Sequence, residues 1–447
     1  MGPGSAILAD VVELPVSVGQ RLLSLMDHYL GEESALNEQV LWRIEGQLDA
    51  GALRVALTKL VARHAALRTA FVGNGRRLRQ VVHEPSPVAL AEADVTGHAD
   101  PDTAARERVS EEMRRTIDAA TSPIRPLLIR IAPATHLFVL TMHHFVTDDW
   151  SNGLLSRDLR RLYAAELAGA DDGLPAVGWQ YAEWSEWQRE RLSGAGLREL
   201  TEYWRHQLDG ARIPELPERA SAPGEGEQPW VSVELPIGPE TTRALRDLAR
   251  RERTTLFPVL LSVFSLLLHD ETRQRDITVA SLFANRGSPQ VADSVGFFVT
   301  MLLLRTDLDR DSPARELVRA TRKTVLAALR HQELPYQLLP PGTISSRTGR
   351  ADDITFQLVG SLKAREDLSG AEIDDMEGML ERRRFAFEFV VAPHEDRLIA
   401  LLLCDRQRFD ADWAARFVAG YVAVADALAA DPDRPAGDLL APQRRTT

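Results

Sequence analysis

Hydrophobic residues recur at helical spacing in several parts of the chain, most clearly between residues 53 and 64. Apolar positions there follow the i, i+4, i+7, i+8 order of one buried helix face. Ser17 is a typical N-cap residue and predicts a helix over residues 18–30, while Ser151 is expected to cap another. Further helices are predicted over residues 53–64, 104–119, 151–167, 240–252, 255–268, 314–331 and 412–430.

Runs that are rich in β-branched and aromatic residues predict strands between these helices. They lie near residues 70–72, 126–131, 137–143, 277–282, 298–306, 354–360, 385–391 and 398–404. Each half of the chain therefore combines helices with a sheet, which is the mixed α/β (α+β) class. A length of 447 residues favours two hydrophobic cores over one. The segment 210–228 is dense in proline, glycine and charge, so we expect it to link domains at 8–209 and 229–445.

Composition narrows the range of functions. The net charge of -12 argues against non-specific binding of nucleic acid. No stretch has the length and apolarity expected of a membrane span, and the N-terminus lacks the features of a signal peptide, so we expect a cytoplasmic protein without a membrane partner. The single cysteine, Cys404, lies in an apolar run, which predicts a buried thiol rather than a reactive one.

The segment from His143 to Asp149 holds the most informative chemistry, because a predicted strand delivers two adjacent histidines to a turn with two aspartates. Consecutive strand residues point to opposite faces, so His143 and His144 do not converge on one metal ion, and we expect no metal site. An imidazole that faces a cleft suits proton transfer near neutral pH. On composition alone, a pair of satisfied core histidines explains the segment equally well.

The segment resembles the His-His-x-x-x-Asp-Gly signature of the condensation domains of non-ribosomal peptide synthesis. It is similar, more loosely, to the His-x-x-x-Asp sequence of chloramphenicol acetyltransferase. Other segments resemble further motifs of the condensation family in the family's order, and together they cover nearly the whole chain. They are residues 17–22, 63–71, 142–151, 181–187, 295–305, 331–336 and 356–358.

The resemblance implies two acetyltransferase-like lobes in a V-shaped pseudo-dimer with a central tunnel. It implies that His144 is catalytic and orients or deprotonates the acceptor nucleophile, that His143 is structural, and that Asp148 pairs with Arg286 to fix the loop. No metal and no bound cofactor are implied, because the substrates arrive as thioesters on the phosphopantetheine arms of carrier proteins. The residues that the resemblance suggests for the tunnel lining are Asp149, Trp150, Gly296, Thr300 and Gln357.

The implied reaction transfers a carrier-bound acyl, aminoacyl or polyketide group to an amine or alcohol, forming an amide or ester in natural-product biosynthesis. The expected partners are an acyl or peptidyl carrier protein as donor and a small-molecule or carrier-bound acceptor. We expect a monomer, either a free-standing enzyme or an excised domain.

Two departures from the family pattern keep alternatives open. Asp149 stands at the signature glycine, and Thr300 stands where asparagine is common. The Asp149 carboxylate either tunes the acceptor or the basicity of His144, or marks a catalytically silent relative that recruits partner enzymes to a carrier-bound peptide. An epimerase is a third interpretation, and it needs a second acid–base group that the sequence does not identify.

Overall fold

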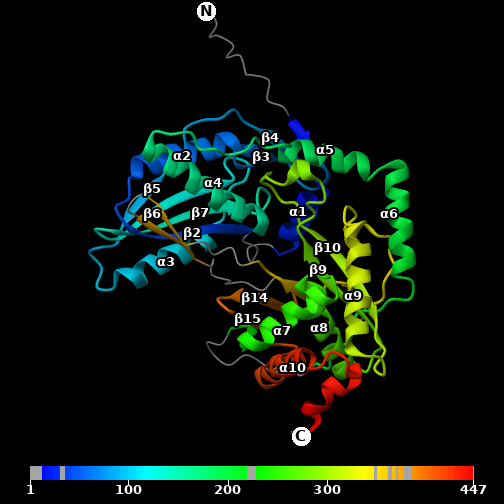
Figure 1. Ribbon diagram of the computed structural model, residues 1–447. Helices are drawn as coiled ribbons and strands as arrows, with labels where there is room; N and C mark the ends of the chain where they lie inside the picture. Colours follow the sequence, from blue (N-terminus) through cyan, green and yellow to red (C-terminus); the bar gives the residue numbers. More distant parts are fainter. Residues whose placement is uncertain are drawn as a thin grey trace, which may run out of the picture. The chain divides into compact units, whose positions relative to one another are not determined.

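The computed structural model describes residues 13–30, 36–218, 228–346, 350–360, 365–368, 371–376 and 385–445 (Figure 1). The chain forms two compact units. The first unit contains Met1–Ser193, Ala284–Val299 and Leu362–Met379, and the second contains the remaining residues. This division differs from the linear one predicted at residues 210–228, because two segments of the C-terminal half belong to the first unit.

The first unit is built on a six-stranded sheet of order β12-β13-β2-β7-β6-β5. Its central strand β7 pairs antiparallel with β2 and with β6, and Asn37 of β2 lies opposite His143 of β7. The strands are β2 (Asn37–Gly46), β5 (Ala91–Asp94), β6 (Ile124–Ala132), β7 (Thr135–His143), β12 (Arg365–Leu368) and β13 (Ala371–Met376).

Alternation along β2 and β7 decides which helices cover each face of this sheet. Trp42, Phe138 and Met142 pack with helices α2 (Ala50–Arg63) and α4 (Asp149–Ala168). Leu41 and Val139 point the other way and pack with α3 (Pro101–Arg114). The sheet is therefore covered by α2 and α4 on one face and by α3 on the other (Figure 1).

Smaller elements complete the first unit. A three-stranded sheet of order β1-β4-β3 lies beside the helices α1 and α5. These elements are β1 (Glu13–Pro15), α1 (Val18–Leu30), β3 (Thr69–Val72), β4 (Arg79–Val82), α5 (Tyr181–Arg191) and the 3-10 turns η2 (Ala65–Arg68), η3 (Gly75–Arg77) and η4 (Pro289–Val291).

The second unit repeats the arrangement of helices against a six-stranded sheet, here of order β10-β9-β11-β14-β15-β8. Helix α8 is apolar on all sides and almost fully buried, as expected for a core helix. The elements are α6 (Gly194–Gln207), β8 (Trp230–Ile237), α7 (Pro239–Arg251), α8 (Leu256–Thr272), β9 (Asp276–Phe283), β10 (Thr300–Asp307), α9 (Ala314–Leu329), η5 (Tyr336–Leu338), β11 (Ile354–Leu358), β14 (Phe387–His394), β15 (Arg397–Asp405), α10 (Ala411–Ala430) and η6 (Ala436–Arg445).

Helix α10 corrects the expectation that no stretch has the length and apolarity of a membrane span. Its 20 residues reach a mean hydropathy of 1.3 over the best window, and half of that window is buried within the protein. Trp413, Phe417 and Tyr421 of this helix lie in the aromatic core of the second unit. Because the core helix of a globular protein has the same composition, α10 is weak support for a membrane span.

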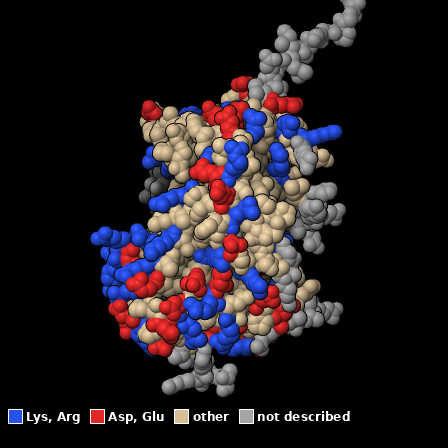
Figure 2. All heavy atoms as spheres, turned by 90° about the vertical axis from the view of Figure 1, so that its right-hand side faces the viewer, with Lys and Arg blue, Asp and Glu red and all other residues tan. Residues whose placement is uncertain are grey.

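The element boundaries mostly follow the predicted pattern, with local differences. Helix α3 ends at Arg114 rather than 119, and its N-cap is Asp100, which accepts a hydrogen bond from Thr103 N. Cys404 is buried in β15, as predicted. Figure 2 shows acidic and basic side chains interspersed over much of one face of the described residues, so this face carries no continuous field of one sign.

A buried ion network ties α2 to α4 in the first unit. The fully buried carboxylate of Asp158 accepts hydrogen bonds from Arg63 Nε at 2.9 Å and Arg157 Nε at 2.7 Å. His64 Nε2 lies 2.9 Å from the same carboxylate. Burial by itself would raise the pKa of Asp158, but the hydrogen bonds from His64, Arg63 and Arg157 lower it to about 2.

Replacing this carboxylate should destabilise the first unit strongly. We expect Asp158→Ala to lower the free energy of unfolding by roughly 3–5 kcal/mol, because two guanidinium groups lose their buried partner. Urea denaturation followed by circular dichroism measures the loss. Since the folded-state pKa of Asp158 lies below its unfolded value, its contribution is present above about pH 4 and is lost as the pH falls towards 2.

The matched control is Glu166→Ala, which removes the exposed ion pair between Lys59 Nζ and Glu166 Oε2 on the same two helices. Exposed pairs contribute about 0–1 kcal/mol. Equal losses in the two variants would contradict a special role for the buried network.

Candidate active site

The two histidines stand where β7 gives way to a short loop before α4. The backbone extends the sheet one step beyond β7, because His144 N donates to Leu36 O at 2.7 Å. Asp148 then caps α4, its Oδ1 accepting from Ser151 N at 2.7 Å. The predicted cap, Ser151, instead lies inside the first turn, where its hydroxyl contacts residue Gly296. The helix therefore starts directly after the histidine loop.

The ring of His144 is held by a hydrogen bond at Nδ1. Nδ1 lies 2.9 Å from the carbonyl oxygen of Thr147, which can only accept, so Nδ1 carries the proton and donates. A neutral imidazole then keeps its lone pair on Nε2. The side chain is 13% exposed, and the edge of the Phe297 ring packs against it. This geometry leaves Nε2 as the atom that can take a proton.

A carboxylate that the sequence analysis did not single out lies close to that nitrogen. Glu38 Oε1 is 3.5 Å from His144 Nε2, and the Glu38 side chain is 18% exposed. Glu38 belongs to β2 and lies opposite Met142 of β7, two residues before His144. Alternation places Glu38 on the same face as Met142. A prediction of β2 as the partner of β7 would have revealed this proximity.

His143 occupies a different environment from its neighbour. Its side chain is buried, its Nδ1 accepts a hydrogen bond from Phe145 N at 3.2 Å, and its ring packs against the Phe145 ring. Burial, and secondarily the charge of His144, lowers the pKa of His143 to about 4. His143 is therefore neutral at physiological pH and is occupied in packing the loop.

Asp148 and Arg286 form the ion pair that the resemblance implies. Arg286 Nη2 lies 3.3 Å from Asp148 Oδ1, and both side chains are nearly inaccessible, at 5% and 1% exposed. Arg286 also donates to the carbonyl oxygens of Val291 and Ser294, and its guanidinium stacks 4.0 Å from the centre of the Phe298 ring. The pair thus joins the histidine loop to the segment 286–298 of the same unit.

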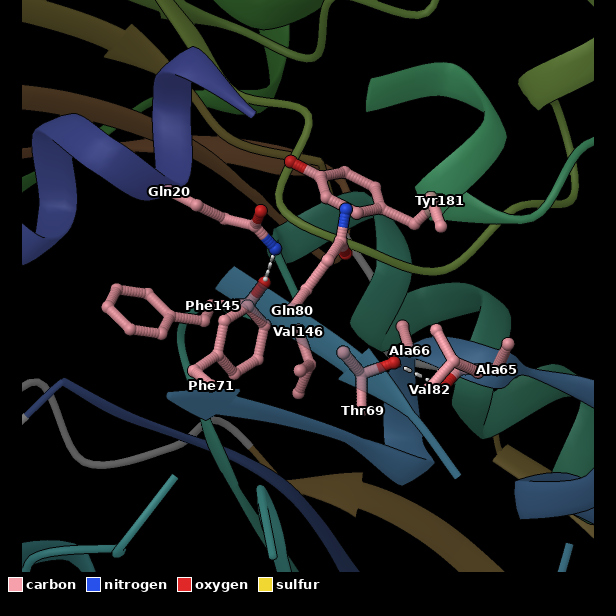
Figure 3. Close-up of a pocket in the computed structure, with 11 residues that line it drawn as sticks. Gln20, Ala65, Ala66, Thr69, Phe71, Gln80, Val82, Phe145, Val146 and Tyr181 are labelled. Atoms are coloured by element: carbon pink, nitrogen blue, oxygen red, sulfur yellow. Dashed lines mark hydrogen bonds between the residues drawn. The ribbon is translucent and has the colours of Figure 1, made fainter. Parts of the chain in front are cut away.

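A second set of polar side chains supports the loop from α1 and α5. Gln20 Nε2 donates to Phe145 O at 2.9 Å, and Figure 3 shows this carboxamide at the wall of a small pocket behind the loop. The Ser17 and Tyr181 hydroxyls are 2.7 Å apart, and Tyr181 in turn donates to Phe297 O. These hydrogen bonds satisfy the buried polar groups of Ser17, Gln20 and Tyr181.

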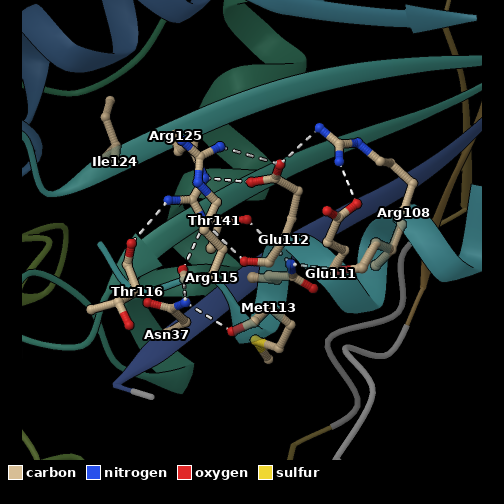
Figure 4. Close-up of polar contacts among 12 residues, drawn as sticks. Asn37, Arg108, Glu111, Glu112, Met113, Arg115, Thr116, Ile124, Arg125 and Thr141 are labelled. Carbon is tan, nitrogen blue, oxygen red and sulfur yellow. Dashed lines mark hydrogen bonds and ion pairs between the residues drawn. The ribbon is translucent and has the colours of Figure 1, made fainter. Parts of the chain in front are cut away.

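The start of β2, next to Glu38, is anchored by the network drawn in Figure 4. Asn37 Nδ2 donates to Met113 O and to Arg115 O, each at 2.8 Å. Arg125 Nη2 donates to Arg115 O, and Arg125 Nε forms an ion pair with the buried Glu112 carboxylate. The end of α3 is thereby held against the strand that carries Glu38.

The residues suggested for a tunnel lining differ in their exposure and in their contacts. Asp149 is exposed in the first turn of α4, and Trp150 is 52% exposed with the Arg286 guanidinium 5.9 Å from its ring centre. Packing requires a glycine at position 296, because a Cβ there would lie 2.0 Å from Cδ2 of Tyr181. Its role as a lining residue has no support in these contacts.

Thr300 and Gln357 belong to the second unit and are both buried. Gln357 Oε1 accepts from Leu282 N at 3.2 Å. Within the described residues, Thr300 Oγ1 and Gln357 Nε2 have no hydrogen-bond partner. Buried polar atoms normally have one. The described residues contain no group of three or more metal-ligating side chains.

Comparison with known proteins gives a consistent match. The family model described as "Condensation domain" matches residues 12–447. Phosphinothricin tripeptide synthetase PhsC of Streptomyces viridochromogenes is 34% identical over 78% of this chain, which spans 33% of that protein. The dimodular nonribosomal peptide synthase of Bacillus subtilis is 30% identical over 97% of this chain, which spans 19% of it. The chain thus corresponds to a part of these much longer relatives.

Solved structures share the fold over nearly the whole chain. The SgcC5 protein from Streptomyces globisporus is 28% identical, with a TM-score of 0.76 over 94% of this chain and 100% of that one. The X-domain from teicoplanin biosynthesis, solved in complex with OxyB, has a TM-score of 0.78 at 23% identity over 98% of each chain. At that identity the second likeness concerns the fold alone.

The Asp148–Arg286 pair should dominate the stability of the histidine loop. We expect Asp148→Ala to lower the free energy of unfolding by roughly 3–5 kcal/mol, because Arg286 is left buried without its counter-ion and α4 loses its cap. Thermal and urea denaturation measure the effect. The control is Asp149→Ala, which removes the adjacent exposed aspartate and should cost about 0.3–1 kcal/mol through the helix dipole. Unchanged melting of the Asp148 variant would show that the pair does not hold the loop.

Proposed function

Because the chain belongs to the condensation-domain family, we propose that it transfers an acyl group from a carrier-bound thioester to an amine or alcohol acceptor. The observation that carries this proposal is the anchored ring of His144. Its Nδ1 is committed to the Thr147 carbonyl, which leaves the Nε2 lone pair on a partly exposed side chain. Such a nitrogen can take or orient the proton of an attacking nucleophile.

The proposed reaction balances with His144 as the only proton carrier. The acceptor nitrogen or oxygen attacks the thioester carbonyl carbon while Nε2 takes its proton. The tetrahedral intermediate then collapses, the bond from carbon to sulfur breaks, and the imidazolium returns a proton to the departing thiolate. The products are an amide or ester and the free phosphopantetheine thiol.

The proposed partners follow from the substrate. The donor is an acyl or peptidyl carrier protein, and the acceptor is a small molecule or a second carrier-bound group. The phosphopantetheine arm enters as part of the substrate, so no resident cofactor is proposed.

The alternative is a silent module that recruits partner enzymes to a carrier-bound peptide. Asp149 at the signature glycine favours it, and the fold of an X-domain that forms a complex with OxyB is compatible with it. The ring geometry of His144 favours the acyltransferase. An epimerase needs two acid–base groups on opposite sides of one carbon atom, and Glu38 lies too close to Nε2 for that arrangement.

The catalytic assignment predicts separate outcomes for the two histidines. We expect His144→Ala to lower turnover by about 10²–10⁴-fold, the usual contribution of a general base, while the melting temperature stays close to that of the wild type. Turnover is measured with carrier proteins loaded with candidate acyl groups and a panel of amines and alcohols, with mass spectrometry of the products.

His143→Ala is the companion variant, because its ring is buried where that of His144 is partly exposed. It should lower the melting temperature, since a packed ring leaves a cavity. If the wild type is active and His144→Ala keeps nearly all of that activity, the assignment of His144 as the proton carrier is wrong.

Asp149→Gly separates the acyltransferase from the silent module. The carboxylate is exposed at the first residue of α4, so its removal should leave the fold intact. If Asp149 tunes an active enzyme, the variant stays active and its acceptor preference or pH optimum changes. A wild type that turns over none of the panel, together with a glycine variant that gains activity, supports the silent module instead. The same assay serves both variants.

A further inference from the structure

The Phe297 side chain is in direct contact with the His144 imidazole. The two ring centres are 4.9 Å apart and the ring planes meet at 71°, which is an edge-to-face contact. The hydrogen bond from Nδ1 to the Thr147 carbonyl restrains the imidazole at one atom. Because the χ2 torsion of histidine has a broad energy well of its own, the groups that pack against the ring decide its plane.

The backbone of Phe297 is held on both sides of its peptide unit. The Tyr181 hydroxyl donates to Phe297 O, and the next residue, Phe298, donates from N to Asp148 Oδ2 at 3.0 Å. Asp148 is also the N-cap of α4, which begins directly after the histidine loop. The Phe297 backbone is therefore fixed to the same loop that carries His144.

The Phe297 ring also contacts the first turn of α1, where the chain has a glycine. A Cβ at position 19 would lie 3.0 Å from both Cδ1 and Cε1 of Phe297. Carbon atoms in favourable van der Waals contact are about 3.5–4.0 Å apart, so the ring occupies space that a larger residue would need. The next residue, Gln20, donates from Nε2 to Phe145 O in the histidine loop (Figure 3). The contacts that lead from Gly19 through Phe297 to His144 thus begin and end at one loop.

We propose that Phe297 is a positioning residue, which sets the plane of the His144 imidazole, and that Gly19 acts through it by leaving room for its ring. The proposal rests on the proposed function, in which Nε2 takes a proton from the acceptor. Such a transfer needs a separation of about 2.6–3.2 Å between the two heavy atoms. A tilt of the imidazole about the nitrogen held by Thr147 displaces Nε2 and lengthens that separation.

Gly19→Ala tests this role without changing a group that reacts. Because the Phe297 backbone is fixed, the added methyl group should displace the ring by about 0.5–1 Å and disturb its contact with His144. Misplacement of a catalytic group by about 1 Å can cost 10²-fold, so we expect kcat to fall by about 10- to 100-fold. KM should stay within about twofold, because the lost interaction belongs to the transition state. The assay is the one with loaded carrier proteins and the panel of acceptors.

Gly51→Ala is the matched control. Gly51 is the second residue of α2, as Gly19 is of α1, so the two substitutions change helix propensity alike. A Cβ at Gly51 would lie 3.1 Å from Oδ1 of Asp49, the end of a side chain that can move aside. The control should keep the kcat of the wild type. A loss as large as that in Gly19→Ala would assign the effect to the helices and overturn the proposal, as would an unchanged kcat in Gly19→Ala.

Phe297→Leu completes a double-mutant cycle. Leucine keeps the position apolar but has no planar ring, so this variant should also lower kcat. If Gly19 acts through the ring, adding Gly19→Ala to Phe297→Leu should cause no further loss. Losses that multiply in the double variant would show that the two residues act independently, which contradicts the proposal.

The ring signals of His144 in NMR spectra give a readout that needs no turnover. In protein with isotope-labelled histidine, and with the signals assigned through His144→Ala, the wild type should show the tautomer protonated at Nδ1. Gly19→Ala should shift the His144 signals, because the Phe297 ring current moves, while those of the buried His64 stay in place. A wild type without turnover counts against the proposed function, and these signals then decide the positioning role. Unchanged His144 signals in Gly19→Ala overturn it.

Discussion

The buried pair of Asp148 and Arg286 is the contact on which the histidine loop depends. One carboxylate accepts from Ser151 N to start α4, from Phe298 N, and from the guanidinium of Arg286. Arg286 Nη1 donates to two backbone carbonyls, and Nη2 also donates to the Ser151 hydroxyl. Two opposite charges out of water are stable only when the remaining donors and acceptors are satisfied. Most donors and acceptors of this pair are satisfied, with Arg286 Nε the exception among the described contacts, and the pair connects the loop that presents His144 to the segment around Phe298.

The two adjacent histidines show how environment separates chemically identical groups. His143 is buried, and desolvation keeps it neutral. His144 is one step further along, beyond the end of β7, and meets a backbone carbonyl with one nitrogen and a carboxylate with the other. The difference arises where the strand ends, because His143 is the last residue of β7 and His144 is the first residue of the turn that follows. The sequence His143-His144 thus supplies one buried ring and one partly exposed ring.

Much of this could be predicted from the sequence, and the exceptions have physical causes. Helix periodicity and the ordered motifs identified the α/β class, the strand that carries the histidines, and the Asp148–Arg286 pair. Strand β2 was missed because polar residues such as Glu38, Gln39 and Arg43 interrupt its apolar pattern. The cap of α4 was placed three residues late, at Ser151, since serine and aspartate are both good caps and only the hydrogen bonds distinguish them. The assignment of segments 284–299 and 362–379 to the first unit is a long-range property that local patterns do not contain.

Strand β2, which was not predicted, matters because it places the Glu38 carboxylate next to the His144 ring. Asp149 attracts attention in the sequence, since it replaces a signature glycine, but its side chain is exposed in the first turn of a helix. Water and salt screen an exposed charge over about 8–10 Å. Glu38 stands out in no motif, yet it is largely buried and 3.5 Å from Nε2 of His144. Interactions between partly buried charges are screened much less than those between exposed charges. The missed strand therefore supplies a carboxylate at the His144 ring that no motif of the sequence identified.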